Sequence, residues 1–104
     1  AQLRFSPAAA RDLEKIFDDL TAAAGASVAL AFLARLRSSL ETLAEFPRIG
    51  RMRASFGPGL RSWAFRPYVA LYRETGSDVE IIRIVHGRRR TTRRHMTESD
   101  QAAS

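Results

Sequence analysis

Apolar residues recur at helical spacing along two consecutive stretches of the chain, and this pattern constrains the fold more than any other feature. The first stripe consists of Leu13, Ile16, Phe17, Leu20 and Ala24. The second consists of Ala29, Leu33, Leu36, Leu40 and Leu43, with Phe32 beside it. Because only a few residues separate the two stripes, the sequence predicts an antiparallel helical hairpin.

Residues that start and stop helices flank both stripes. Ser6-Pro7 is typical of a helix start, with Ser as the N-cap and Pro at the first helical position. Gly25 is placed to end this helix, and Ser27 is placed to cap the next one. We expect the second helix to run to about Glu45, because Phe46-Pro47 follows and the residue before a proline is pushed out of the helical region.

The rest of the chain follows strand patterns. Alternating polar and apolar residues indicate a short strand over Gln2–Phe5. After a turn-rich basic loop over Arg48–Gly59, three more strands are predicted over Leu60–Phe65, Tyr68–Glu74 and Val79–His86. The order β-α-α-β-β-β indicates a small α+β domain, with the helical hairpin packed on one face of an antiparallel sheet.

The last of these strands is the most apolar. Five of the eight residues in Val79–His86 are aliphatic, so we expect this strand to be central and covered on both faces. Thr75–Asp78 is a hairpin connection of suitable length between this strand and the one before it. Pro67 shortens the preceding link into a tight turn.

Length and composition indicate a small cytoplasmic domain. The chain has 104 residues, which suits one domain over residues 1–104, with residues from about 91 to 104 forming a flexible tail. It has no cysteine, which excludes a disulfide framework, a zinc ribbon and a thiol nucleophile. No apolar run approaches the roughly 20 residues of a membrane span, and no signal peptide is visible. We therefore expect a cytoplasmic protein without membrane contact.

Positive charge is concentrated in the second half of the chain. Residues 1–45, 46–97 and 98–104 carry net charges of −1, +9 and −2, which gives the chain its +6. Sixteen of the 17 basic residues are Arg, whose planar fork suits carboxylates and phosphates. A basic half of this kind indicates an acidic protein or a nucleic acid as a partner.

Residues for enzymatic chemistry are sparse. His86 and His95 are the only histidines, and no carboxylate lies near them at ligand spacing, so the sequence predicts neither a metal site nor a cofactor. A metal-independent ribonuclease would remain possible, with Arg61 and Arg83 as cations and His86 as acid or base. With strict alternation, however, Arg83 and His86 point to opposite faces of the sheet.

Two further groups of residues could serve partner binding. The densest positive charge follows the last strand, where it could be a solvated tail, a docking segment for an acidic partner or a phosphate-binding segment. Its members are Arg88, Arg89, Arg90, Arg93 and Arg94. Trp63 and Phe65 share a strand face with Arg61, and these aromatic rings could stack on bases, anchor a protein interface or simply fill the sheet core.

The sequence resembles ParE-type toxins of the ParE/RelE superfamily from about Leu3 to Arg89. The resemblance begins with LRFSPAAARDLEKIFDDL and continues through LETLAEFPRIGRMR. It is strongest across GLRSWAFRPYVALYRETG and EIIRIVHGRR. These segments occur in the same order and with the same spacing as in the family.

The resemblance implies a toxin that poisons DNA gyrase and is neutralised by a ParD-like antitoxin encoded beside it. The antitoxin would wrap its C-terminal segment around the toxin in a hetero-oligomer. Operator DNA would be reached only through the antitoxin's N-terminal part. The RelE-like branch of the superfamily instead cleaves messenger RNA on the ribosome, using basic and acid/base side chains on the open sheet face.

Departures from the nuclease pattern favour the gyrase-poison branch. Arg51 and Arg53 stand where nuclease relatives often carry lysines or a glutamate, and Gly87-Arg88-Arg89 replaces a catalytic tyrosine. The common Asp after the HGRR-like ending is Arg90 here, so the terminal segment is expected to dock differently. We therefore predict a non-enzymatic toxin, with a ribosome-dependent endoribonuclease as the alternative.

Two sets of contacts complete the prediction. The antitoxin is expected to cover the helical hairpin and the sheet edge, with contacts at Ile16, Leu20, Arg61, Trp63 and Phe65. The target is expected to contact Arg88, Arg89, Arg90, Arg93 and Arg94.

Overall fold

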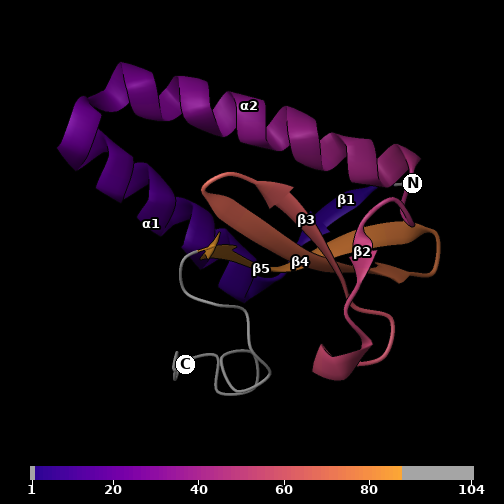
Figure 1. Cartoon of the computed structure of the whole chain (residues 1–104). Coiled ribbons are helices and arrows are strands. Elements are labelled where there is room, and N and C mark those ends of the chain that lie inside the picture. Colours follow the sequence, from indigo (N-terminus) through magenta and orange to yellow (C-terminus); the bar gives the residue numbers. More distant parts are fainter. Residues whose placement is uncertain (1, 88–104) are drawn as a thin grey trace.

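A computed structural model describes residues 2–87, which form two helices over a five-stranded sheet (Figure 1). The helices are α1 (Pro7–Ala24) and α2 (Ala26–Glu45), and a short 3-10 helix, η1, spans Ala54–Phe56. The strands are β1 (Leu3–Phe5), β2 (Arg51–Met52), β3 (Arg61–Phe65), β4 (Tyr68–Thr75) and β5 (Asp78–His86). The predicted α+β class and helical hairpin are confirmed.

The sheet is mixed, so the expectation of a purely antiparallel sheet was wrong. Its strand order is β1-β5-β4-β3-β2, and β1 runs parallel to β5, with Leu3 opposite Val79 and Phe5 opposite Ile81. The other pairs are antiparallel. Strand β2 lies within the loop predicted over Arg48–Gly59, where two residues are too few to give a strand pattern in the sequence.

The predicted start of the first helix is confirmed, and that of the second was wrong. The Oγ of Ser6 accepts a hydrogen bond from the N–H of Ala9 at 3.0 Å, which caps α1. Gly25, at φ 96°, both ends α1 and begins α2, and α2 has no side-chain cap among the described residues. Because one residue suffices for the turn, Ser27 already lies within α2 and cannot cap it.

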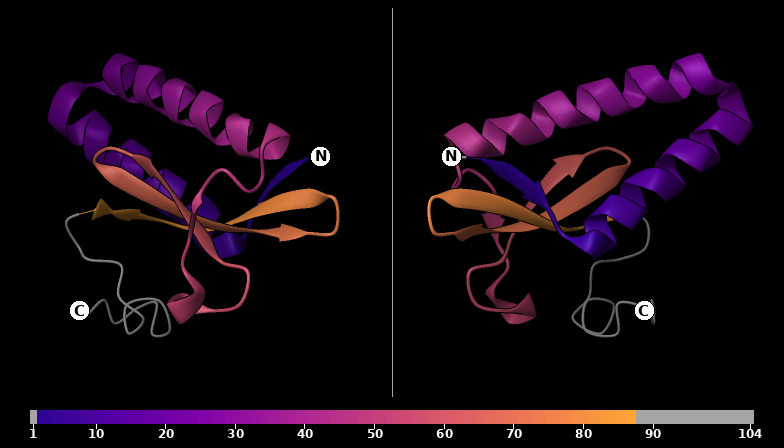
Figure 2. Two further views of the ribbon diagram at one scale, coloured as in Figure 1. Left: turned by 45° about the vertical axis from the view of Figure 1, so that its right-hand side comes forward. Right: turned by 180° about the vertical axis from the view of Figure 1, so that it is seen from behind.

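Both helices lie on one side of the sheet, and the loop with η1 projects on the other side (Figure 2). The core lies between the helices and the sheet. Its fully buried side chains include Leu36, Leu40, Leu43, Tyr72, Val79 and Ile81. Strand β5 is central, as predicted, but the helices cover only one of its faces, and Glu80 and Ile82 remain half-exposed.

The N-terminal part of α1 covers the edge of β5 at the point where β1 ends. The N–H of Ser6 donates to the carbonyl of Ile81 at 3.0 Å, and its Oγ donates to the carbonyl of Ile82 at 2.8 Å. Beyond this point the Asp12 carboxylate accepts the N–H of Ile84 at 2.8 Å. The same carboxylate forms a two-pronged ion pair with Arg83, at 2.8 and 3.1 Å. Side chains of α1 thus continue the hydrogen bonding that β1 begins.

We predict that Asp12→Ala lowers the free energy of unfolding by about 2–3 kcal/mol, because it removes the carboxylate that pairs with the part-buried Arg83 guanidinium and accepts the N–H of Ile84. Urea unfolding followed by circular dichroism measures the loss. Asp18→Ala, at an exposed position of the same helix, is the matched control and should change stability by less than about 0.5 kcal/mol. Equal losses for the two variants would contradict this role of Asp12.

Candidate partner-binding surface

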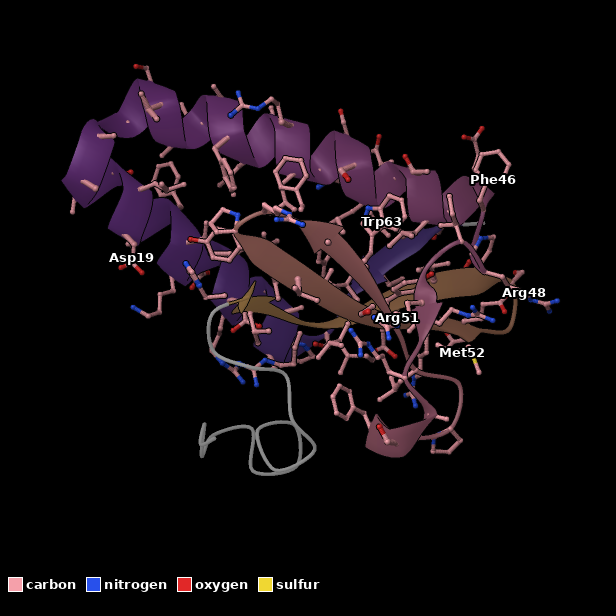
Figure 3. All side chains as sticks on the ribbon, in the orientation of Figure 1. Asp19, Phe46, Arg48, Arg51, Met52 and Trp63 are labelled. Carbon is pink, nitrogen blue, oxygen red and sulfur yellow. The ribbon has the colours of Figure 1, made fainter. Side chains whose placement is uncertain are left out.

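Arg61, Trp63 and Phe65 lie on one face of β3, as predicted. Across the strand pair they face Tyr72, Ala70 and Tyr68 of β4, which belong to the helix side of the sheet. Trp63 lies beneath α2 (Figure 3), and its Nε1–H donates to the Oγ of Ser39 at 2.9 Å. The ring is half-buried and packs on the core, so part of it remains open to a partner.

A row of aromatic rings, here called the aromatic ledge, continues from Phe65 across the sheet. Phe32 of α2 contacts Phe65 and Tyr68 edge to face, with centroid distances of 5.4 and 5.8 Å. Tyr68 contacts His86 in the same way at 5.4 Å. All four rings are half-buried. Rings of this kind, apolar in body and partly open to water, are frequent anchors of protein interfaces.

The Tyr68 phenol of the ledge is held in its neutral form. Burial raises the pKa of Tyr68 above its ordinary value of 10.0, and the nearby Asp19 carboxylate raises it further, against a smaller opposing effect of Lys15. The group is therefore protonated at neutral pH. It can donate a hydrogen bond to a partner, and it is not a phenolate base.

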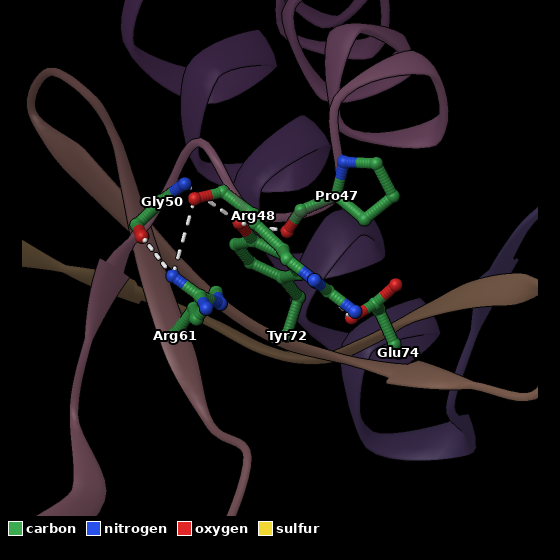
Figure 4. A network of polar contacts seen from close by, with 6 residues as sticks. All are labelled: Pro47, Arg48, Gly50, Arg61, Tyr72 and Glu74. Carbon is green, nitrogen blue, oxygen red and sulfur yellow. Dashed lines mark hydrogen bonds and ion pairs between the residues drawn. The ribbon is translucent and has the colours of Figure 1, made fainter.

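Arg61 holds the backbone of the loop after α2 (Figure 4). Its Nη1 donates to the carbonyl of Gly50 at 2.9 Å and to the carbonyl of Arg48 at 3.1 Å. Arg61, which was predicted as an antitoxin contact and as a nuclease cation, thus binds the backbone of its own chain. Its guanidinium positions the loop.

Tyr72 anchors the same loop from inside the core. Its hydroxyl accepts the N–H of Gly50 at 2.8 Å and donates to the carbonyl of Pro47 at 2.8 Å. Position 50 needs glycine, because a Cβ there would lie against the Tyr72 ring and 2.8 Å from the carbonyl oxygen of Ser62. Neither role was predicted from the sequence, since nothing local to residue 72 indicates a partner 22 positions away.

The three residues proposed for the nuclease alternative are dispersed. Arg83 lies opposite Leu71 and His86 opposite Tyr68, positions of opposite parity on β4, so the two residues occupy opposite faces of the sheet as expected. Arg61 shares a face with His86 but lies at the Tyr72 end of β4, about 13 Å along the strand from Tyr68. The polar contacts of Arg61 are made with the loop, and Arg83 binds Asp12.

The two predicted contacts on α1 differ in exposure. Ile16 is 5% exposed and belongs to the core cluster, so it is a core residue in the described chain and not a surface contact. Leu20 is half-buried at the edge of that cluster and keeps a surface that a partner could cover. The stripe was predicted correctly. The spacing of the apolar residues does not show which of them are fully buried and which lie at the edge of the stripe.

Some predictions fall outside the described residues. The target contacts Arg88, Arg89, Arg90, Arg93 and Arg94 and the tail over residues 91–104 all lie beyond residue 87. Within residues 2–87, no group of three or more His, Cys, Asp or Glu side chains could hold a metal ion. No helix in that part of the chain is long and apolar enough to cross a membrane.

Three large apolar side chains that the sequence analysis did not propose as partner contacts are exposed. Phe46, Ile49 and Met52 keep 57%, 49% and 52% of their surface open to solvent. Figure 3 shows Phe46 at the end of α2 and Met52 well below it, with Arg48 at a height between them, all at the opposite end from Asp19. For Ile49 and Met52 a signal was present in the sequence, because large apolar residues in the predicted turn-rich basic loop have no predicted helix or strand face to bury them.

The sequence profile of a family described as ParE toxin of type II toxin-antitoxin system, parDE, matches residues 3–91. Toxin ParE3 of Caulobacter vibrioides is 44% identical over 77 residues, which are 74% of this chain and 77% of that protein. Toxin ParE1 of Mycobacterium tuberculosis is 33% identical over 84 residues, which are 80% of this chain and 86% of that protein.

Two solved structures are similar in fold. A structure described as the chromosomal ParDE TA system from P. aeruginosa superposes with a TM-score of 0.72 and 28% identity, covering 82% of this chain and 94% of that one. The toxin–antitoxin complex RelBE2 from Mycobacterium tuberculosis gives a TM-score of 0.56 and 27% identity, covering 82% of this chain and 95% of that one.

We predict that Tyr72→Phe costs about 1–3 kcal/mol of unfolding free energy, because the N–H of Gly50 and the carbonyl of Pro47 lose their partner inside the protein. Tyr68→Phe is the matched control, since its hydroxyl makes no hydrogen bond to another described residue. Urea unfolding compares the two. A Tyr72→Phe protein as stable as Tyr68→Phe would show that the hydroxyl does not anchor the loop.

We also predict that both tyrosines of the chain ionise above pH 10.0 in the folded state, because burial raises the pKa of Tyr68 and of Tyr72. Absorbance at the phenolate band follows the titration directly. The unfolded chain loses these protons first, so the free energy of unfolding should fall as the pH rises past 10.0. A normal titration of either phenol in the folded protein would be inconsistent with its burial.

Proposed function

Because the chain belongs to the ParE toxin family of type II toxin–antitoxin systems, we propose that it inhibits DNA gyrase by binding and is neutralised by a cognate ParD-like antitoxin. The observation that carries the non-enzymatic part of this proposal is the dispersal of Arg61, Arg83 and His86. General acid–base cleavage of RNA needs these groups around one phosphate, within hydrogen-bonding reach of its oxygens. Here they lie on two faces and at two ends of the sheet.

The relatives support the pairing with an antitoxin. The similar solved structures are a ParDE system and a RelBE2 toxin–antitoxin complex. In our proposal the toxin and the antitoxin form a hetero-oligomer in the cytoplasm. Operator DNA is bound by the antitoxin alone, and the toxin uses no cofactor.

The antitoxin would cover the aromatic ledge and the neighbouring rim of the hairpin. Leu20, Trp63 and Phe65 remain candidates for this contact, because each keeps part of its side chain at the surface. Arg61 contributes by holding its loop, and Ile16 contributes only to the core. We assign gyrase, or the DNA bound to it, to the basic segment Arg88, Arg89, Arg90, Arg93 and Arg94.

The alternative function is that of a ribosome-dependent endoribonuclease. One observation favours it, since the fold is also similar to that of the RelBE2 complex. The TM-score is lower for that complex than for the ParDE system, 0.56 against 0.72. His86 would then be the acid or base, beside Tyr68 at the end of β5.

The purified chain is predicted to inhibit supercoiling by gyrase and to leave ribosome-bound messenger RNA intact. The reason is that a binding inhibitor needs a surface, whereas a nuclease needs a convergent acid, base and cation. A gel assay of plasmid supercoiling is run beside an in vitro translation reaction whose transcripts are mapped. Transcript cuts that Arg83→Ala or His86→Ala abolishes, with gyrase unaffected, would establish the nuclease instead.

Trp63→Ala is predicted to weaken the antitoxin complex more than it lowers the melting temperature of the toxin, because the half-buried ring belongs partly to the proposed interface. Ser39→Ala is the matched control, since it removes the hydrogen bond to the indole and keeps the ring. Affinity is measured by calorimetry, and stability by thermal unfolding. A large loss of stability with unchanged affinity would make Trp63 a core residue only.

A further inference from the structure

We propose that a groove on the helical hairpin binds the basic segment over residues 88–94 of the same chain. The groove lies between α1 and α2, and we call it the hairpin groove. Its lining residues are Leu13, Glu14, Phe17, Asp18 and Leu33. The segment that it takes follows residue 87, the last that the structure describes. The contact forms within the free chain and goes beyond the proposed function.

The hairpin groove combines apolar and acidic side chains in an open hollow of about 350 Å³. Leu13, Phe17 and Leu33 are half-buried, so each keeps apolar surface open to solvent. Glu14 and Asp18 are exposed and lie one turn apart on α1. An arginine suits both kinds of lining, because its methylene stem covers apolar surface while its guanidinium pairs with a carboxylate.

The two acids of the hairpin groove lack the cations that most other acids of the described chain have. Residues 2–87 contain nine acids, of which six form ion pairs: Asp12, Asp19, Glu41, Glu74, Asp78 and Glu80. Within that part of the chain, Glu14, Asp18 and Glu45 have no ion pair, and two of these three line the groove. The groove thus offers two carboxylates to a cation from outside residues 2–87.

The point from which the basic segment starts lies beside α1. Asp12 of α1 binds the side chain of Arg83 and the N–H of Ile84, and Gly87 follows three residues later. An extended chain spans about 3.3–3.6 Å per residue, so residue 94 can lie up to about 23 Å from residue 87. A helix is about 10–12 Å across with its side chains, so half its circumference is less than about 20 Å. The segment is therefore long enough to pass around α1 to the hairpin groove.

The basic segment also has the charge that the hairpin groove calls for. Five of its seven residues are arginines, and none is an acid. Helix α1 carries two basic residues against four acids. Exposed ion pairs are weak one by one, but a short tether raises the effective concentration of the segment at the groove into the millimolar range. Several such pairs with one tethered segment can therefore form where free ions would not bind.

Other occupants suit the hairpin groove less well. The carboxylates of Glu14 and Asp18 would repel the phosphates of a nucleic acid. A metal ion would find two carboxylates there, and within residues 2–87 no group of three or more His, Cys, Asp or Glu side chains could hold one. A second copy of the chain would have to compete with a segment that is already tethered nearby.

The contact has a consequence for the toxin, and this consequence alone rests on the proposed function. The arginines that the hairpin groove would hold are the ones that we assign to gyrase or its bound DNA. Because one arginine cannot serve both at once, α1 and the target compete for the segment. The free chain then inhibits only in the fraction of molecules whose segment is released.

The test measures the contact in the full chain by paramagnetic broadening of amide NMR signals. Because the chain has no cysteine, Thr92→Cys places a single nitroxide within the basic segment. Glu14→Gln with Asp18→Asn removes the charges of the hairpin groove and keeps its shape. Glu41→Gln with Glu45→Gln, exposed on α2, is the matched control with the same change in net charge.

We expect the nitroxide to broaden the amide signals of residues 13–18 in the otherwise unchanged chain and in the control variant. The groove variant should lose this broadening. So should the unchanged chain at about 1 M salt, where the Debye length falls to about 3 Å. Unshifted signals from the sheet verify that each variant folds.

Absence of broadening at residues 13–18 in the unchanged chain, or equal broadening in both double variants, would overturn the inference. A mixed sample tests for a second copy, since it pairs isotope-enriched chain without nitroxide with unenriched chain that carries it. Broadening in that sample would assign the contact to a neighbouring molecule, and so would also overturn the inference.

A supercoiling assay separates this inference from the proposed function. Release of the basic segment should let the groove variant inhibit gyrase at a concentration at least about twofold lower than the control variant needs. Equal inhibition by the two variants would overturn the competition with the target. Failure of the wild-type chain to inhibit gyrase would overturn the proposed function and leave the contact as the nitroxide measures it.

Discussion

The hydrogen bonding along β5 is the constraint on which the rest of the structure depends. This strand pairs with β4 along one edge and with β1 along the other. Where β1 ends, the N-cap residue Ser6 and Asp12 of α1 continue the hydrogen bonding at Ile82 and Ile84. Because a buried peptide group without a partner is costly, this arrangement fixes the path of α1 as well as the sheet. The path of α1 then sets the direction of α2, because the turn between the two helices is one residue long. It also sets the position of the loop that Tyr72 anchors.

Local patterns in the sequence predicted the elements, and long-range contacts decided how they combine. The stripes gave both helices, and the runs around Trp63, Tyr72 and Ile84 gave β3, β4 and β5. The parallel pairing of β1 could not be read from three residues. The extra residue Ile82 in β5 could not be read either, because it is visible only in the register against β4.

Candidate site residues were harder to predict than the fold, for a physical reason. Periodicity identifies an apolar face and does not say which of its members a neighbour covers. Ile16 was predicted to contact the antitoxin and lies in the core, whereas Trp63 and Phe65 are half-buried. Phe46 and Ile49 are exposed, and the loop backbone between them is held by Tyr72 and Arg61.

A toxin that works through its surface inhibits by occupying its target, and a toxin that works through an active site turns over. The measurement that separates these most directly is a titration of gyrase with the purified chain, in which residual supercoiling activity is followed against the molar ratio and against time. Our account predicts an end point set by the molar ratio and independent of the incubation time. Progressive inactivation of gyrase or of ribosome-bound transcripts by amounts of toxin far below stoichiometric would contradict it.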